Sequence, residues 1–185
     1  MKIINQNLKN NQKGFGLIEV TVSIYILVMG LLSLVSLMNQ NLRMQDINKN
    51  TIIAAQLAQE GVELVRNIRD NNWLNQSNSN WQQDIIGGLG GGVSMPISID
   101  YNGRSSIKTI SDIDDIQAKL YLDSSGYYVN ESTGNTPTLF SRMLEKTNPS
   151  SEYMEIKATV KWSERGTNHD FKVATRLYNW RYANR

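Results

Sequence analysis

A single carboxylate, Glu19, interrupts an apolar stretch that runs from Phe15 to Met38 and contains no Lys, Arg, Asp, Asn, Gln or Pro. By insertion scales, an ionisable group costs on the order of 2.5 to 3.5 kcal/mol at the centre of a membrane and less near its edge. Such a residue usually marks a function that involves a partner. The alternative is that Glu19 lies close enough to the membrane edge to remain hydrated.

The other residue types that carry out chemistry form no catalytic pattern. The chain has no cysteine, which excludes disulfides, thiolate metal sites and a cysteine nucleophile. Its one histidine, His169, is expected in a solvated hairpin loop, and no Gly-x-Ser-x-Gly sequence accompanies it. Asp112, Asp114 and Asp115 form an acidic loop, but the glycine and terminal glutamate of a calcium loop are missing. We therefore expect no catalytic residue, no metal ligand and no cofactor.

The apolar stretch is long enough to cross a membrane. Its 24 residues would form a helix about 36 Å long, against a hydrocarbon core of roughly 30 Å. Lys2, Lys9 and Lys13 precede it, so the positive-inside bias keeps the amino terminus in the cytoplasm. We predict a transmembrane helix over residues 15–38. A cleaved secretory signal and an uncleaved generic anchor are alternatives, although the stretch is too long for a signal and no small-x-small cleavage site follows it.

The residues at the start of this stretch resemble the recognition sequence of type IV prepilins and type II secretion pseudopilins: Lys13-Gly14-Phe15-Gly16-Leu17-Ile18-Glu19. The resemblance implies that a prepilin peptidase cuts after Gly14 and N-methylates the new terminus at Phe15. It also implies that residues 1–14 are a leader peptide and that Glu19 is the carboxylate used in assembly. The implied partners are the peptidase, other pilin or pseudopilin subunits and the inner-membrane assembly platform.

Cleavage at this junction would place a positively charged amine on Phe15, about 6 Å along the helix from Glu19. This distance is close to one rise between stacked subunits, so the amine of one subunit can meet the carboxylate of its neighbour. In a low dielectric the pair satisfies two charges that are each unfavourable alone.

Removal of the leader also takes away three lysines, which leaves 16 basic against 17 acidic residues and turns a net charge of +2 into −1. The electrostatic argument for nucleic-acid binding is then largely lost.

Residues 39–74 continue the helical pattern. Apolar or small residues recur at spacings of three and four and share one face: Ala54, Leu57, Gly61, Leu64 and Ile68. The opposite surface carries polar residues: Gln56, Gln59, Glu63, Arg66 and Asp70. We predict an amphipathic continuation of the membrane helix that packs on a sheet. A coiled coil is the alternative, but barely two heptads with Gly61 in the seam argue against it. Residues 55–70 also resemble the corresponding helix of V-type minor pilins.

The remainder of the chain changes to a period of two. Residues 75–117 are predicted as a loop-rich connection that contains a glycine-rich run at 87–92, and residues 118–185 as an antiparallel sheet. Alternation predicts strands at 154–162 and 171–177, joined as a hairpin around Gly166, a second hairpin at 119–122 and 127–129, and a strand at 138–144. The terminal hairpin resembles that of minor pilins. We therefore expect an α+β fold of the type IV pilin kind, with a long amino-terminal helix on an antiparallel sheet.

Together these features predict a non-enzymatic, structural and minor subunit of a type IV pilus or a type II secretion pseudopilus. It is expected as a single-pass protein of the inner (cytoplasmic) membrane, with its amino terminus cytoplasmic and its outer domain extracytoplasmic, and then in the filament. One alternative is a DNA-binding competence pilin, in which aromatic and basic residues stack on single-stranded DNA: Arg176, Tyr178, Trp180, Arg181 and Tyr182. The other is a membrane-anchored enzyme, for which the sequence offers no set of catalytic residues.

Overall fold

The computed structural model describes residues 14, 16–74, 81–82, 85, 96–147, 150 and 152–179. Several predicted features lie outside the described residues: the leader up to Lys13, Phe15, the glycine-rich run at 87–92, and Trp180 to Tyr182. The chain divides into two compact units, Met1–Asp46 and Ile47–Arg185. Helix α1 (Leu17–Leu74) contributes residues to both.

The first unit contains the apolar part of α1. Its side chains from Leu17 to Met38 are exposed, and α1 is long and apolar enough to cross a membrane. The hydroxyl groups of Thr21, Ser23 and Ser33 each donate to a helix carbonyl three or four residues earlier, at 2.7 to 2.9 Å. A hydroxyl that is bonded within its own helix needs no water, which makes this segment compatible with an apolar environment.

In the second unit, the remainder of α1 packs on the sheet through one face, as the sequence predicts. Ala54, Leu57, Gly61 and Ile68 are buried, and Leu64 is half-buried against the core. The buried face is wider than predicted, because it also includes Ala58, Val62, Val65, Arg69, Asn72 and Trp73. On the opposite surface, Glu63 and Arg66 form an ion pair three residues apart, with Arg66 Nη1 2.6 Å from Glu63 Oε2.

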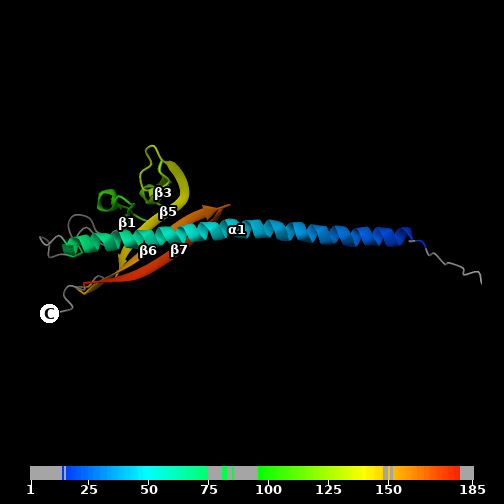
Figure 1. Ribbon diagram of the computed structural model, residues 1–185, viewed down its shortest axis with the longest axis horizontal. Helices are drawn as coiled ribbons and strands as arrows, with labels where there is room; N and C mark the ends of the chain where they lie inside the picture. The colour runs from blue at the N-terminus through cyan, green and yellow to red at the C-terminus, as the bar shows by residue number, and fades with distance from the viewer. Residues whose placement is uncertain are drawn as a thin grey trace, which may run out of the picture. The chain divides into compact units, whose positions relative to one another are not determined.

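The sheet is antiparallel and has seven strands: β1 (Ile97–Ser98), β2 (Lys108–Thr109), β3 (Lys119–Leu122), β4 (Tyr128–Val129), β5 (Thr136–Thr147), β6 (Tyr153–Glu164) and β7 (Thr167–Tyr178). Two short 3₁₀ helices, η1 (Gly103–Ser106) and η2 (Ile116–Ala118), lie between them. Strand β5 is central, with β6 along one edge and both β3 and β1 along the other. Figure 1 shows β5, β6 and β7 beside the second half of α1. The predicted α+β fold, a long helix on an antiparallel sheet, is therefore confirmed.

The longest hairpin joins β6 and β7 in unbroken register from Glu164↔Thr167 to Tyr153↔Tyr178. Its two-residue turn has positive φ at both central positions, 51° at Arg165 and 82° at Gly166. This geometry matches the right-handed twist of the paired strands. The side chain of Asn50 on α1 donates to Glu164 Oε2 at 2.9 Å and so ties the helix to the end of the hairpin. The predicted hairpin at 154–162 and 171–177 is confirmed.

The other strands follow the alternation less closely. The hairpin predicted at 119–122 and 127–129 is present as β3 and β4, and the strand predicted at 138–144 extends to twelve residues in β5. In contrast, the predicted loop-rich connection contains β1 and β2, so the sheet begins before residue 118. Strand β1 is two residues long and pairs Ile97 with Leu144. Two residues are too few to show a period, which is why the pattern missed this strand.

Gly61 allows α1 to approach β5 closely, and we expect Gly61→Val to lower the free energy of unfolding by about 1 to 3 kcal/mol. A Cβ atom at this position would lie 3.1 Å from Leu144 Cδ2 and 3.2 Å from Arg142 Cδ, so the side chain of valine must push these two buried side chains aside. Urea unfolding of the full chain in detergent micelles, followed by tryptophan fluorescence, measures the loss. Gln59→Val on the exposed face is the matched control. Equal stability of the two variants would contradict the close approach.

Candidate functional site

The predicted assembly site lies at the start of α1. Gly14 and Glu19 are described and exposed, whereas Phe15 is outside the described residues. Glu19 lies in the first turn, where its backbone N–H donates to the Gly16 carbonyl at 3.0 Å, and a carboxylate there interacts favourably with the helix amino terminus. No described residue binds its side chain. The cleavage, methylation and assembly roles of these residues stay predictions.

The acidic loop is held by its own hydrogen bonds and by one lysine. Asp114 lies 2.5 and 2.8 Å from Lys161 Nζ on β6. Asp115 accepts from the backbone N–H and the hydroxyl of Ser111, and Asp112 accepts from the backbone N–H of Asp114. Among the described residues, no three His, Asp or Glu side chains are grouped so that they could hold a metal ion. The three aspartates therefore act as loop caps and as a partner for Lys161.

His169 is not in a loop, so its predicted position is wrong. It lies within β7, half-buried, with its ring stacked on Trp162 at a centroid distance of 5.3 Å. The hairpin loop consists of Arg165 and Gly166 alone, because the two strands pair up to the turn. The alternation of apolar residues begins only at Phe171, so it did not indicate that the strand begins at Thr167.

On the outer face of β6 and β7, each lysine or arginine side chain lies beside a carboxylate. Arg176 lies over the ring of Tyr153 at 5.4 Å and 3.9 Å from Glu155 Oε2, and Lys172 lies 2.6 Å from Asp170. The remaining lysines of β6 are also paired, Lys157 with Glu145 and Lys161 with Asp114. Each described Lys and Arg of these two strands therefore has a carboxylate partner. Of the residues predicted to stack on DNA, Trp180, Arg181 and Tyr182 are outside the described residues.

A second candidate site, which the sequence did not indicate, is a groove between α1 and the turn that follows Ile99. The groove has a volume of about 560 Å³, within the range of small-ligand sites. It is lined on α1 by Glu60, Glu63, Leu64, Asn67, Ile68 and Asn71, and on the turn by Tyr101, Asn102, Gly103 and Arg104. The two walls are about thirty or more residues apart along the chain, and only packing brings them together.

Arg142 fixes the distance between the two walls. It is fully buried on β5, where Nη1 donates to the Leu57 carbonyl of α1 at 3.0 Å and Nη2 donates to the Ile99 carbonyl. Nη1 also lies 3.5 Å from Glu60 Oε2. Burial lowers the pKa of the Arg142 guanidinium, and the Glu60 carboxylate opposes that shift. One side chain thus joins the helix, the central strand and the segment that leads into the turn.

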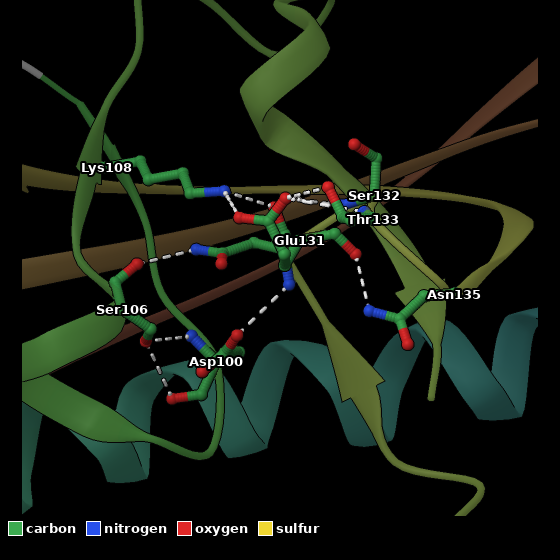
Figure 2. A network of polar contacts seen from close by, with 8 residues as sticks. Asp100, Ser106, Lys108, Glu131, Ser132, Thr133 and Asn135 are labelled. Atoms are coloured by element: carbon green, nitrogen blue, oxygen red, sulfur yellow. Dashed lines mark hydrogen bonds and ion pairs between the residues drawn. The ribbon is translucent and has the colours of Figure 1, made fainter. Parts of the chain in front are cut away.

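The shape of the turn is set by Asp100, whose side chain is buried beneath it. Oδ1 of Asp100 accepts from the backbone N–H of Asn102 at 2.9 Å, and its carbonyl accepts from the N–H of Gly103 at 2.8 Å. Oδ2 accepts from the N–H of Asn130 at 3.2 Å, and Asn130 Nδ2 donates to the Ser106 carbonyl at 2.7 Å. Figure 2 shows Asp100 beside Ser106, whose hydroxyl accepts from the Asp100 backbone N–H at 2.9 Å. Because both carboxylate oxygens are used, the turn is held on two sides.

Lys108 and Glu131 extend this network. Lys108 Nζ donates to the Asn130 carbonyl at 2.7 Å and lies 3.2 Å from Glu131 Oε2 (Figure 2). Two hydrogen bonds lower the pKa of Glu131. The one from Lys108 has the larger effect, and the one from the backbone N–H of Thr133 has the smaller effect. These contacts join residues 100–108 to residues 130–131, which follow β4. The turn that forms one wall of the groove is therefore held in place by the rest of the sheet.

No family model matches the chain, and no curated protein or solved structure matches it. The resemblance to pilins therefore rests on the residues around Gly14 and Glu19 and on the arrangement of the fold. A long apolar amino-terminal helix packed on an antiparallel sheet is compatible with a pilin-like fold.

Proposed function

We propose that the chain is a structural, minor subunit of a type IV pilus or a type II secretion pseudopilus. In this proposal it is cleaved after Gly14, anchored in the inner membrane by the first part of α1 and assembled into a filament through that helix. The observation that carries the proposal is the single, continuous helix. It combines an exposed apolar segment, a carboxylate five residues after Gly14, and a second half packed on a sheet.

The chemistry of the first unit supports this use of the helix. The side chains of Leu17 and Ile18 are 82% and 78% exposed, and those that follow to Met38 are exposed as well. Such a surface needs lipid or neighbouring apolar helices around it. Within this segment the hydroxyl groups of Thr21, Ser23 and Ser33 are bonded to the helix backbone, whereas no described residue binds the Glu19 side chain. In the proposed filament, the amine on Phe15 of a neighbouring subunit would give this carboxylate a cationic partner.

We expect the native protein to begin at N-methyl-Phe15. Prepilin peptidase would remove residues 1–14, and intact-mass and peptide mass spectrometry of the protein from its own membrane measures the terminus directly. Gly14→Asp is the matched variant, since a charged side chain at the junction is expected to block cleavage and to retain the leader. A native chain that begins at Met1, or one that begins after Met38, would contradict the proposal.

The DNA-binding alternative has less support. The four described cations of β6 and β7 are each paired with a carboxylate, so this face offers no unpaired basic stripe for phosphates. A gel-shift assay of the full chain with single-stranded DNA at low and high salt separates the two possibilities. We expect no salt-sensitive shift, and a shift that weakens steeply with salt would favour the competence pilin instead.

A further inference from the structure

The groove between α1 and the turn combines an apolar surface with uncharged polar side chains. Leu64 and Ile68 contribute the apolar part, and the side chains of Asn67 and Asn71 lie one helical turn apart beside them. Across the groove, Tyr101 is 48% exposed. A surface of this kind suits a ligand that has both hydroxyl groups and an apolar C–H face.

The two asparagines leave hydrogen-bonding capacity for a ligand. Asn71 Nδ2 donates to Asn67 Oδ1 at 2.8 Å. That bond leaves the Nδ2 group of Asn67 as a donor and Oδ1 of Asn71 as an acceptor, and no described residue uses either. A neighbouring donor and acceptor match adjacent hydroxyl groups, since each hydroxyl can both donate and accept.

The charged groups of this groove are engaged within the protein. The carboxylate of Glu63 is paired with Arg66, and that of Glu60 lies beside Arg142. The guanidinium of Arg104 donates to the neutral amide of Asn72, so it keeps its positive charge. The groove therefore offers the hydrogen-bonding groups of the asparagines beside one cation, and hydroxyl groups of a ligand can bind to both.

The aromatic side of the groove is held in place. The hydroxyl of Tyr101 donates to Asp123 Oδ2 at 3.3 Å, and its ring lies 5.2 Å from that of Tyr127. Loss of surrounding water and the Asp123 carboxylate raise the pKa of Tyr101, so the phenol remains a donor. With Asp100 fixing the turn from below and Arg142 fixing its distance from α1, the walls need no rearrangement to accept a ligand.

We propose that this groove is a saccharide-binding site, in which Asn67 and Asn71 bind ring hydroxyl groups and Tyr101 contacts the C–H face of the sugar. A peptide bound by strand addition is less well suited, because the walls are a helix and a turn and offer no strand edge with a row of backbone-pairing groups. The proposal goes beyond filament assembly and does not depend on it, since the groove lies wholly within the second unit.

A glycan-binding experiment on the full chain tests the site. The chain is held in micelles of lauryldimethylamine oxide, which has no sugar headgroup, and applied to a printed array of bacterial and mammalian glycans. Any glycan that binds is then titrated, with saturation-transfer NMR as the readout. We expect at least one glycan to bind, and Tyr101→Ala and Asn67→Leu each to weaken binding by about tenfold.

Matched controls separate the groove from the rest of the surface. Tyr178→Ala and Asn168→Leu change the same residue types on β7 and are expected to bind like the unaltered chain. Tyr101→Phe keeps the ring and is expected to retain most of the affinity, which guards against loss of folding in Tyr101→Ala. Failure of every glycan to exceed the detergent blank, or unchanged affinity in either groove variant, would overturn the proposal. The mass of the native amino terminus is independent of all these results.

Discussion

Glu19→Ala is expected to reduce incorporation into filaments by about a hundredfold or more, because an amine buried without its carboxylate costs about 3 to 5 kcal/mol. The chain should still insert into the membrane, since removing a charge makes the apolar segment easier to insert. The leader should still be removed, because the junction after Gly14 is unchanged. Filaments sheared from cells and membrane fractions, both quantified by immunoblot, give the two populations.

Two controls make this result specific to the carboxylate. Glu19→Gln keeps the size of the side chain and its ability to accept hydrogen bonds, but it lacks the charge and should also assemble poorly. Glu63→Ala removes an exposed glutamate from the same helix, where the ion pair with Arg66 is solvated, and should assemble normally. If Glu19→Ala enters filaments as well as the unaltered chain does, the assembly role assigned to Glu19 is wrong.

Arg142→Ala is expected to lower the free energy of unfolding by about 3 to 5 kcal/mol, the usual loss when one member of a buried charged network is removed. The substitution opens a cavity between α1 and β5, and it removes the donors to the Leu57 and Ile99 carbonyls. Urea unfolding of the full chain in micelles, followed by tryptophan fluorescence, measures the difference.

Arg66→Ala provides the matched comparison for Arg142. The Arg66 side chain is 41% exposed and forms a surface ion pair with Glu63 on α1, so its removal should cost about 1 kcal/mol or less. The assignment of Arg142 as the link between helix, strand and turn predicts a clear gap between the two variants. Similar losses would mean that the buried guanidinium contributes no more than a surface charge.

The fold could be predicted where one face of an element is buried over several turns or several pairs. The spacing of Ala54, Leu57 and Ile68 indicated the packed face of α1, and the alternation from Met154 to Trp162 indicated β6, because burial imposes the period on the residue types. Strand β1 is too short for any period. His169 precedes the apolar alternation of its strand, so the extended backbone there is determined by pairing with β6.

The two candidate sites differ in how far the sequence could predict them. The residues around Glu19 are adjacent in sequence, so their pattern is visible before folding. The groove is assembled from two distant segments, and the Asn67 and Asn71 spacing alone resembles any polar helix surface. Arg142 did leave a signal that was missed. It shares the inward parity of Phe140 and Leu144 on β5, and a charged residue at an inward position needs a buried partner.

The bond between Arg142 and the Leu57 carbonyl also has a consequence for synthesis. The two residues are separated by 85 positions, so at about 5 to 20 residues per second Arg142 is made roughly 4 to 17 s after Leu57. Throughout that interval the apolar face of α1 has no sheet to cover it. The core of the second unit can therefore close only after β5 has been made, although every buried residue of α1 is already present.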